Sequence, residues 1–239
     1  VNLLFPFIFD KEGLKQLFSP VFPDMEAVLP IEHTEQYLSF EWVPPKNYLR
    51  EELHTGALRR GIGNTSIDFA LLYADAKKRK IMVLGEMKYA ESYHHQKFGT
   101  TKAGRGKLDL YEPFYFAETS PFLSDTHDLF PDLSQEPYYQ LLRQQLLARQ
   151  IELHHAPSLF AVNLLYLYTS RNRGLIQTQL PAASSNKRDM FDTWTSLLKV
   201  PDRFHPMDMR DLLSVSEIRL HPTYMPWFEY MTERYRFLT

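Results

Sequence analysis

The 239-residue sequence contains no cysteine, no long apolar run and little net charge. Disulfides, thiol catalysis and cysteine-ligated zinc are therefore excluded, and a reducing cytoplasm is compatible with this composition. No apolar stretch approaches the ~18 residues of a membrane-spanning helix, so we expect no membrane partner. A formal net charge of −2 excludes a uniformly basic nucleic-acid-binding surface, although it leaves room for a local one.

The N-terminal segment lacks the features of a signal peptide. Val1 to Phe9 is apolar, but it has neither a basic start nor a small-residue cleavage site. We therefore expect a cytoplasmic location. The segment resembles the middle of a helix, so residues upstream of Val1 would bear on the completeness of any site.

What the sequence does contain is ample material for a core. Hydrophobic residues make up 44% of the chain and aromatic residues 14%, which indicates a globular protein. No internal repeat or linker interrupts it. We expect a single α/β domain over residues 1–239, with a core over about residues 1–175 and a helical extension over about residues 188–239.

The most informative stretch is a predicted β-hairpin within residues 63–89. Ile67 to Ala74 and Ile81 to Tyr89 have strand composition, and a polar turn rich in lysine and arginine separates them. Side chains alternate between the faces of a strand. One face of the second strand therefore begins with Met82 and Leu84 and ends with Glu86 and Lys88.

The hairpin places charged residues where core residues are expected. A turn centred near Lys77 or Lys78 sets Asp68 opposite Glu86 or Lys88. Half-buried charges are costly unless they are paired or bind a metal. Two carboxylates beside a lysine predict a Mg²⁺ site, because Mg²⁺ prefers oxygen ligands. The alternative is a salt bridge at the end of a sheet.

The spacing of Asp68 and Glu86-Met87-Lys88 resembles the signature of the PD-(D/E)XK nuclease superfamily. The flanking stretches, residues 65–68 and 86–92, also resemble a group of poorly characterised bacterial restriction-endonuclease-like proteins. Ile67 stands where the superfamily name has proline, a position that varies widely.

The resemblance implies a metal-dependent endonuclease that hydrolyses DNA. Asp68, Glu86 and the backbone carbonyl of Met87 would bind Mg²⁺, with Mn²⁺ as a substitute, and Lys88 would orient the attacking water. A homodimer suits an enzyme that cuts both strands, although no residue here demonstrates one. The alternatives are a non-catalytic nucleic-acid-binding or assembly module on the same fold, and a phosphatase that uses the same acids.

The remaining elements fit the restriction-endonuclease-like α-β-β-β-α-β core with a mixed sheet. Early helices precede a strand at Glu35 to Val43, and a helix from Tyr138 to His154 precedes an apolar strand at Ser158 to Thr169. Glu41 on the first strand and Gln140 on the helix are accessory site candidates. For each of them, an ordinary exposed polar residue is the alternative.

A basic segment follows the second strand of the hairpin. Residues 90–112 combine lysine and arginine with three glycines and several aromatic side chains. Such a segment beside an acidic site suits contact with a nucleic-acid backbone. The alternative is a solvated loop.

Overall fold

The computed structural model describes residues 3–31, 35–51, 64–89, 107–178, 180, 189–216, 218 and 221–235. Its strands are β1 (Met25–Leu29), β2 (Leu38–Trp42), β3 (Ile67–Asp75), β4 (Lys80–Met87), β5 (Ala161–Tyr168) and β6 (Phe204–Asp208). Its α-helices are α1 (Lys11–Phe18), α2 (Glu112–Tyr115), α3 (Tyr138–His155), α4 (Arg173–Ile176), α5 (Met190–Ser196), α6 (Met209–Val215) and α7 (Met225–Arg234). Its 3-10 helices include η1 (Phe5–Phe7), η2 (Lys107–Leu110), η3 (Ser124–Ser134), η5 (Pro201–Arg203) and η7 (Pro222–Tyr224).

The strands form one mixed sheet in the order β1-β3-β4-β5-β6, with β2 also paired to β3. β1 pairs antiparallel with the C-terminal half of β3, and β2 pairs antiparallel with its N-terminal half. The two short strands thus share one edge of β3. β3 and β4 form the antiparallel hairpin, whereas β4, β5 and β6 are parallel.

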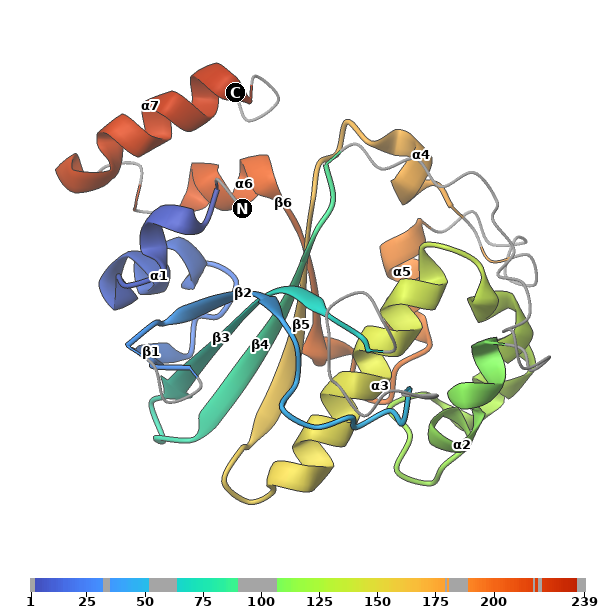
Figure 1. The fold of residues 1–239 in the computed structure, drawn as a ribbon. Helices are drawn as coiled ribbons and strands as arrows, with labels where there is room; N and C mark the ends of the chain where they lie inside the picture. The colour runs from blue at the N-terminus through green and yellow to red at the C-terminus, as the bar shows by residue number, and fades with distance from the viewer. Residues whose placement is uncertain are drawn as a thin grey trace.

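Helices cover both faces of the sheet (Figure 1). α3 lies across one face with α2 and α5, and α1, α6 and α7 lie on the other. The alternation of β4 explains the two layers, because Met82 and Leu84 join the core under α3 while Ile81 and Val83 join the core under α1. Glu86 and Lys88 follow the parity of Met82, so they belong to the α3 face.

The tight turn between β3 and β4 sets the register of the hairpin. The Asp75 carboxylate accepts hydrogen bonds from the backbone N–H groups of Lys77 and Arg79 at 2.9 and 2.8 Å, and it pairs with the Arg79 guanidinium at 2.7 Å. Lys78 adopts a positive φ of 62°. This local network holds the pairing of Phe69 with Gly85 farther along the hairpin.

The predicted fold class is confirmed. The hairpin, the α3 helix and the apolar strand β5 lie within a few residues of their predicted bounds. Two strands were missed. β1 lies in a segment expected to be helical, and β6 lies in the C-terminal region expected to contain helices alone. Each is five residues long and includes half-buried or exposed positions, so neither shows a clear alternation.

Across the described ranges, no helix is long and apolar enough to span a membrane.

Gly85 on β4 offers a test of the packing behind the hairpin. A Cβ atom added there would lie 2.0 to 2.3 Å from ring atoms of Phe69, the residue paired with it. We expect Gly85→Ala to lower the free energy of unfolding by about 1–3 kcal/mol, because a fully buried ring must move. Chemical denaturation would measure the loss.

Gly174 on α4 is the matched control, since a Cβ there would meet nothing within 4 Å. Equal stability changes for Gly85→Ala and Gly174→Ala would contradict the packing argument.

Candidate active site

The candidate site lies where the hairpin strands end, between the sheet and α3. Continuing the β3–β4 register by one residue from the Phe69–Gly85 pair places Asp68 opposite Glu86. The Asp68 carboxylate, which is half-buried, accepts a hydrogen bond from the backbone N–H of Met87 at 2.9 Å. The two acids therefore stand side by side on adjacent strands, on the face that α3 covers.

The Glu86 carboxylate is almost fully buried and is held by three side chains. Its Oε1 accepts hydrogen bonds from Gln140 Nε2 at 2.6 Å and lies 2.7 Å from Lys88 Nζ. Its Oε2 accepts a hydrogen bond from Gln144 Nε2 at 2.6 Å. Gln140 and Gln144 are one helical turn apart on α3, so they reach the sheet from the same helix face.

Burial raises the pKa of Glu86 to about 7. Removal from water disfavours the charged form most strongly, and the negative charge of Asp68 adds to this effect. The Lys88 ammonium and the Gln144 amide act in the opposite direction. Glu86 is thus a carboxyl group that can change its charge near neutral pH.

Glu136 lies at the start of α3, close to the same charges. Burial raises its pKa, although Lys88 and Arg143 oppose that shift. Its carboxylate accepts a hydrogen bond from the Gln140 backbone N–H at 3.3 Å. This contact links Glu136, which precedes α3, to Gln140, whose side chain binds Glu86.

A second buried polar cluster borders the site. The Glu51 carboxylate accepts hydrogen bonds from Thr65 N–H at 2.5 Å, Thr65 Oγ1 at 2.6 Å and Tyr111 OH at 2.6 Å. The Arg143 guanidinium contributes through Nε, which lies 3.2 Å from Glu51 Oε1 and 3.1 Å from Thr65 Oγ1. The cluster joins α3 to Thr65, three residues before Asp68, and so fixes the entry to β3.

The structure brings together Asp68, Glu86, Lys88 and Gln140, all of which the sequence pointed to. Their catalytic and metal-binding roles remain predictions. Glu41 on β2 lies in the register position opposite Asp68, with a positive φ of 51° that removes it from the alternation of the strand. Within the described residues, no group of three or more histidine or acidic side chains could hold a metal ion. Glu41 therefore does not form a three-acid centre with Asp68 and Glu86.

Sequence reasoning missed Gln144 and the Glu51 cluster. Gln144 had a usable signal, because it lies four residues after Gln140 and faces the same way on a helix. The Glu51 cluster had none, since it joins residues from positions 51, 65, 111 and 143. Most of the basic segment predicted to contact nucleic acid, residues 90–106, lies outside the described residues.

A family model described as "Restriction Endonuclease associating with ARP" matches residues 1–236. The chain belongs to this family. Membership confirms the expected restriction-endonuclease-like relationship and suggests a nuclease. Neither the curated proteins nor the solved structures contain a match.

The raised pKa of Glu86 predicts a pH-dependent stability in the absence of divalent ions. The folded state holds the proton up to about pH 7, whereas the ordinary pKa is 4.5. The protonated Glu86 carboxyl therefore contributes fully to the free energy of unfolding below pH 4.5, and this contribution is lost as pH rises through about 7. The shift corresponds to at most about 3 kcal/mol.

We expect Glu86→Gln to abolish this dependence, so that the variant gains stability relative to wild type on going from pH 5 to pH 8. Denaturation in EDTA at both pH values would measure the difference. Glu229→Gln, which changes an exposed glutamate on α7, is the control and should leave the dependence unchanged. A Glu86→Gln variant that instead loses stability relative to wild type between pH 5 and pH 8 would refute the assignment.

The Glu51 cluster predicts a large loss of stability when its acceptor is removed. Glu51→Ala would leave the Arg143 guanidinium, the Thr65 hydroxyl and the Tyr111 hydroxyl without their shared partner. We expect a loss of about 3 kcal/mol in the free energy of unfolding.

Glu118→Ala serves as a control, because the Glu118 side chain is exposed. A loss below about 0.5 kcal/mol for Glu51→Ala would show that the cluster does not stabilise the fold.

Proposed function

We propose that this protein is a Mg²⁺-dependent endonuclease that hydrolyses DNA phosphodiester bonds, with the PD-(D/E)XK arrangement of Asp68, Glu86 and Lys88. The observation that carries the proposal is the meeting of two carboxylates and a lysine at one end of the β3–β4 hairpin. Membership in a restriction endonuclease family supports the same reaction class and DNA as the substrate.

The donor set suits a hard divalent cation. Asp68 and Glu86 are close enough for the charge of one to raise the pKa of the other, and a cation between them would relieve that repulsion. Glu86 Oε2 accepts one hydrogen bond, from Gln144, and a carboxylate oxygen has a second lone pair. With the Met87 carbonyl, these residues would hold Mg²⁺, leaving further positions for water and a substrate phosphate.

When bound, the ion would polarise the phosphodiester and favour the hydroxide form of a bound water. The protein would supply positioning and charge. Lys88, held 2.7 Å from Glu86, would orient the attacking water and offset negative charge that develops on the phosphoryl oxygens. Gln140 and Gln144 would fix the orientation of the Glu86 carboxylate, as outer hydrogen-bond partners commonly do for metal ligands.

Cleavage of supercoiled plasmid with Mg²⁺ or Mn²⁺ tests this proposal. We expect wild type to nick or linearise the plasmid, and we expect Asp68→Ala and Lys88→Ala to lose at least about 100-fold in rate. Lys77→Ala, in the exposed turn of the same hairpin, should retain wild-type activity. A Tm measured for each variant would confirm that it is folded.

Full activity in the folded Asp68→Ala variant would exclude the proposed mechanism.

The second candidate function is a non-catalytic nucleic-acid-binding or assembly module. One observation favours it, since both oxygens of the Glu86 carboxylate have amide or ammonium partners within the protein. Mn²⁺ binding measured by calorimetry separates the two functions. The nuclease proposal requires that wild type binds Mn²⁺ and that Asp68→Ala does not, whereas the non-catalytic module has no such requirement.

A further inference from the structure

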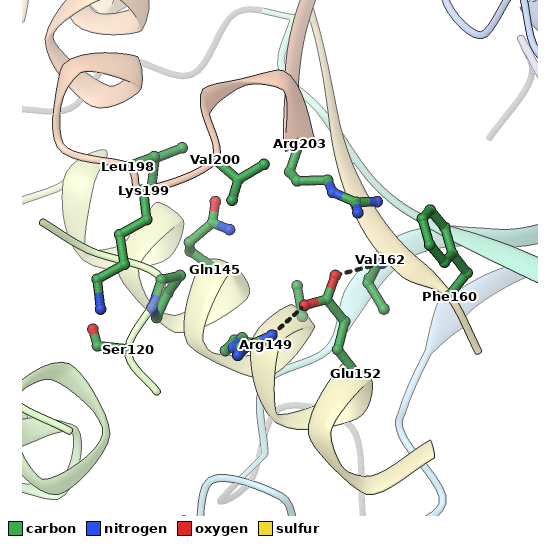
Figure 2. A pocket seen from close by; sticks show the side chains of 12 residues that line it. Ser120, Gln145, Arg149, Glu152, Phe160, Val162, Leu198, Lys199, Val200 and Arg203 are labelled. Atoms are coloured by element: carbon green, nitrogen blue, oxygen red, sulfur yellow. Dashed lines mark hydrogen bonds and ion pairs between the residues drawn. The ribbon is translucent and has the colours of Figure 1, made fainter. Parts of the chain in front are cut away.

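A cavity of about 230 Å³ lies apart from the candidate active site, between α3, the start of β5 and the segment that leads into β6 (Figure 2). Its lining includes Val162 at the N-terminal end of β5, next to the point where Ala161 pairs with Ile81 of β4. Glu86 pairs with Tyr166 five residues farther along the same strands, which corresponds to roughly 16 Å. The cavity is therefore separate from the Asp68–Glu86–Lys88 site.

The charged lining of the cavity is predominantly basic. Arg149, Lys199 and Arg203 line it together with one acid, Glu152, so its formal charge is +2. The Glu152 carboxylate is already engaged, because Oε1 accepts from the Val162 N–H at 2.8 Å and Oε2 pairs with Arg149 at 3.0 Å. The groups left to bind a ligand are therefore the hydrogen-bond donors and positive charges of Arg149, Lys199 and Arg203, which favour an anion.

The cations keep donors available beyond their contacts within the protein. Lys199 Nζ donates to the Glu118 carbonyl at 3.0 Å, which uses one of its three N–H groups. The Arg203 guanidinium makes a long hydrogen bond, from Nη1 to Asn163 Oδ1 at 3.4 Å, and lies over the ring of Phe160. Arg149 Nε and Nη1 bind the Thr119 carbonyl and Glu152, and its second terminal nitrogen carries further N–H groups.

A buried amide provides an independent sign of a missing partner. Gln145 is 5% exposed, and its Oε1 has no hydrogen-bond partner in the structure. Figure 2 shows its carboxamide directed into the cavity toward Val200, with Arg203 on the far side. An unpaired buried carbonyl is costly, so a ligand that carries a donor would relieve it.

We propose that this cavity binds a small phosphate monoester. Such a group carries about −1.5 to −2 charge at neutral pH, which complements the lining, and its oxygens accept hydrogen bonds from arginine and lysine. The organic part would offer a hydroxyl or amino donor to Gln145. Two sources share this chemistry, a free mononucleotide and the 5′-phosphate end of a DNA strand.

Titration calorimetry of the full chain in EDTA tests the proposal, with deoxyadenosine 5′-monophosphate and inorganic phosphate as probes. We expect saturable binding of the nucleotide and none of deoxyadenosine, which lacks the phosphate. The double variant Lys199→Gln/Arg203→Gln should weaken binding at least tenfold. The control Lys77→Gln/Arg210→Gln loses the same charge at exposed positions outside the cavity and should bind like wild type.

Gln145→Leu separates a ligand contact from a mere packing defect. Loss of the buried unpaired oxygen should leave Tm unchanged or raise it, while nucleotide binding weakens at least tenfold. Unchanged nucleotide binding in this variant would overturn the role given to Gln145. Absence of saturable binding by wild type, or equal weakening in the control double variant, would overturn the site itself.

Short duplexes with and without a 5′-phosphate identify the source. Competition with the nucleotide by the phosphorylated duplex alone assigns the cavity to a DNA end, whereas no competition by either duplex assigns it to a free nucleotide. Lys88→Ala should bind the nucleotide like wild type, because the cavity is independent of the candidate active site. Failure of the nuclease proposal would therefore leave this result unaffected.

Discussion

The structure depends on the burial of one carboxylate at a strand–helix junction. Glu86 lies near the C-terminal end of β4, on the same face as Met82 and Leu84, which belong to the core. An acid in that position is tolerated only if polar groups replace the water it loses. Gln140, Gln144 and Lys88 supply those groups, so the crossing of α3 over the hairpin and the state of Glu86 are mutually dependent.

The same junction explains why the site sits at the end of the hairpin rather than along it. The Asp75 network at the turn sets the register, and the register puts Asp68 beside Glu86 at the other end. If the pairing of β4 with β3 shifted by one residue, the Asp68 and Glu86 carboxylates would lie on opposite faces of the sheet. The Glu51 cluster holds the start of β3 from the α3 side, so the two acids are fixed from both ends of the strand.

Basic character is distributed over the molecule in separate places despite the small net charge. Lys88 and Arg143 lie near the acids of the candidate active site, whereas Arg149 and Arg203 line a cavity at the opposite ends of the parallel strands. α3 contributes to both, with Gln140 and Gln144 toward its start and Arg149 one to two turns later. A single helix thus presents two chemically different sets of polar side chains to the two ends of one sheet.

The sequence by itself determined the elements whose signals are local. The polar turn between two apolar runs predicts the hairpin, and strand parity together with a turn centred near Lys77 or Lys78 predicts that Asp68 and Glu86 share a face. The long apolar run predicts β5, and the residues around Glu86 and Lys88 predict a restriction-endonuclease-like relationship, which the whole-chain family match supports. Such features need only neighbouring residues, so one sequence suffices to read them.

Only the tertiary structure decided which distant residues meet. β1 and β6 are short strands whose pairing comes from their neighbours in the sheet, so their composition carried too little signal. The amide partners of Glu86 come from a helix more than 50 residues away, and the shared acceptor Glu51 binds donors from three separate segments. Burial then sets the pKa of Glu86, and burial is a property of the packed fold rather than of any stretch of sequence.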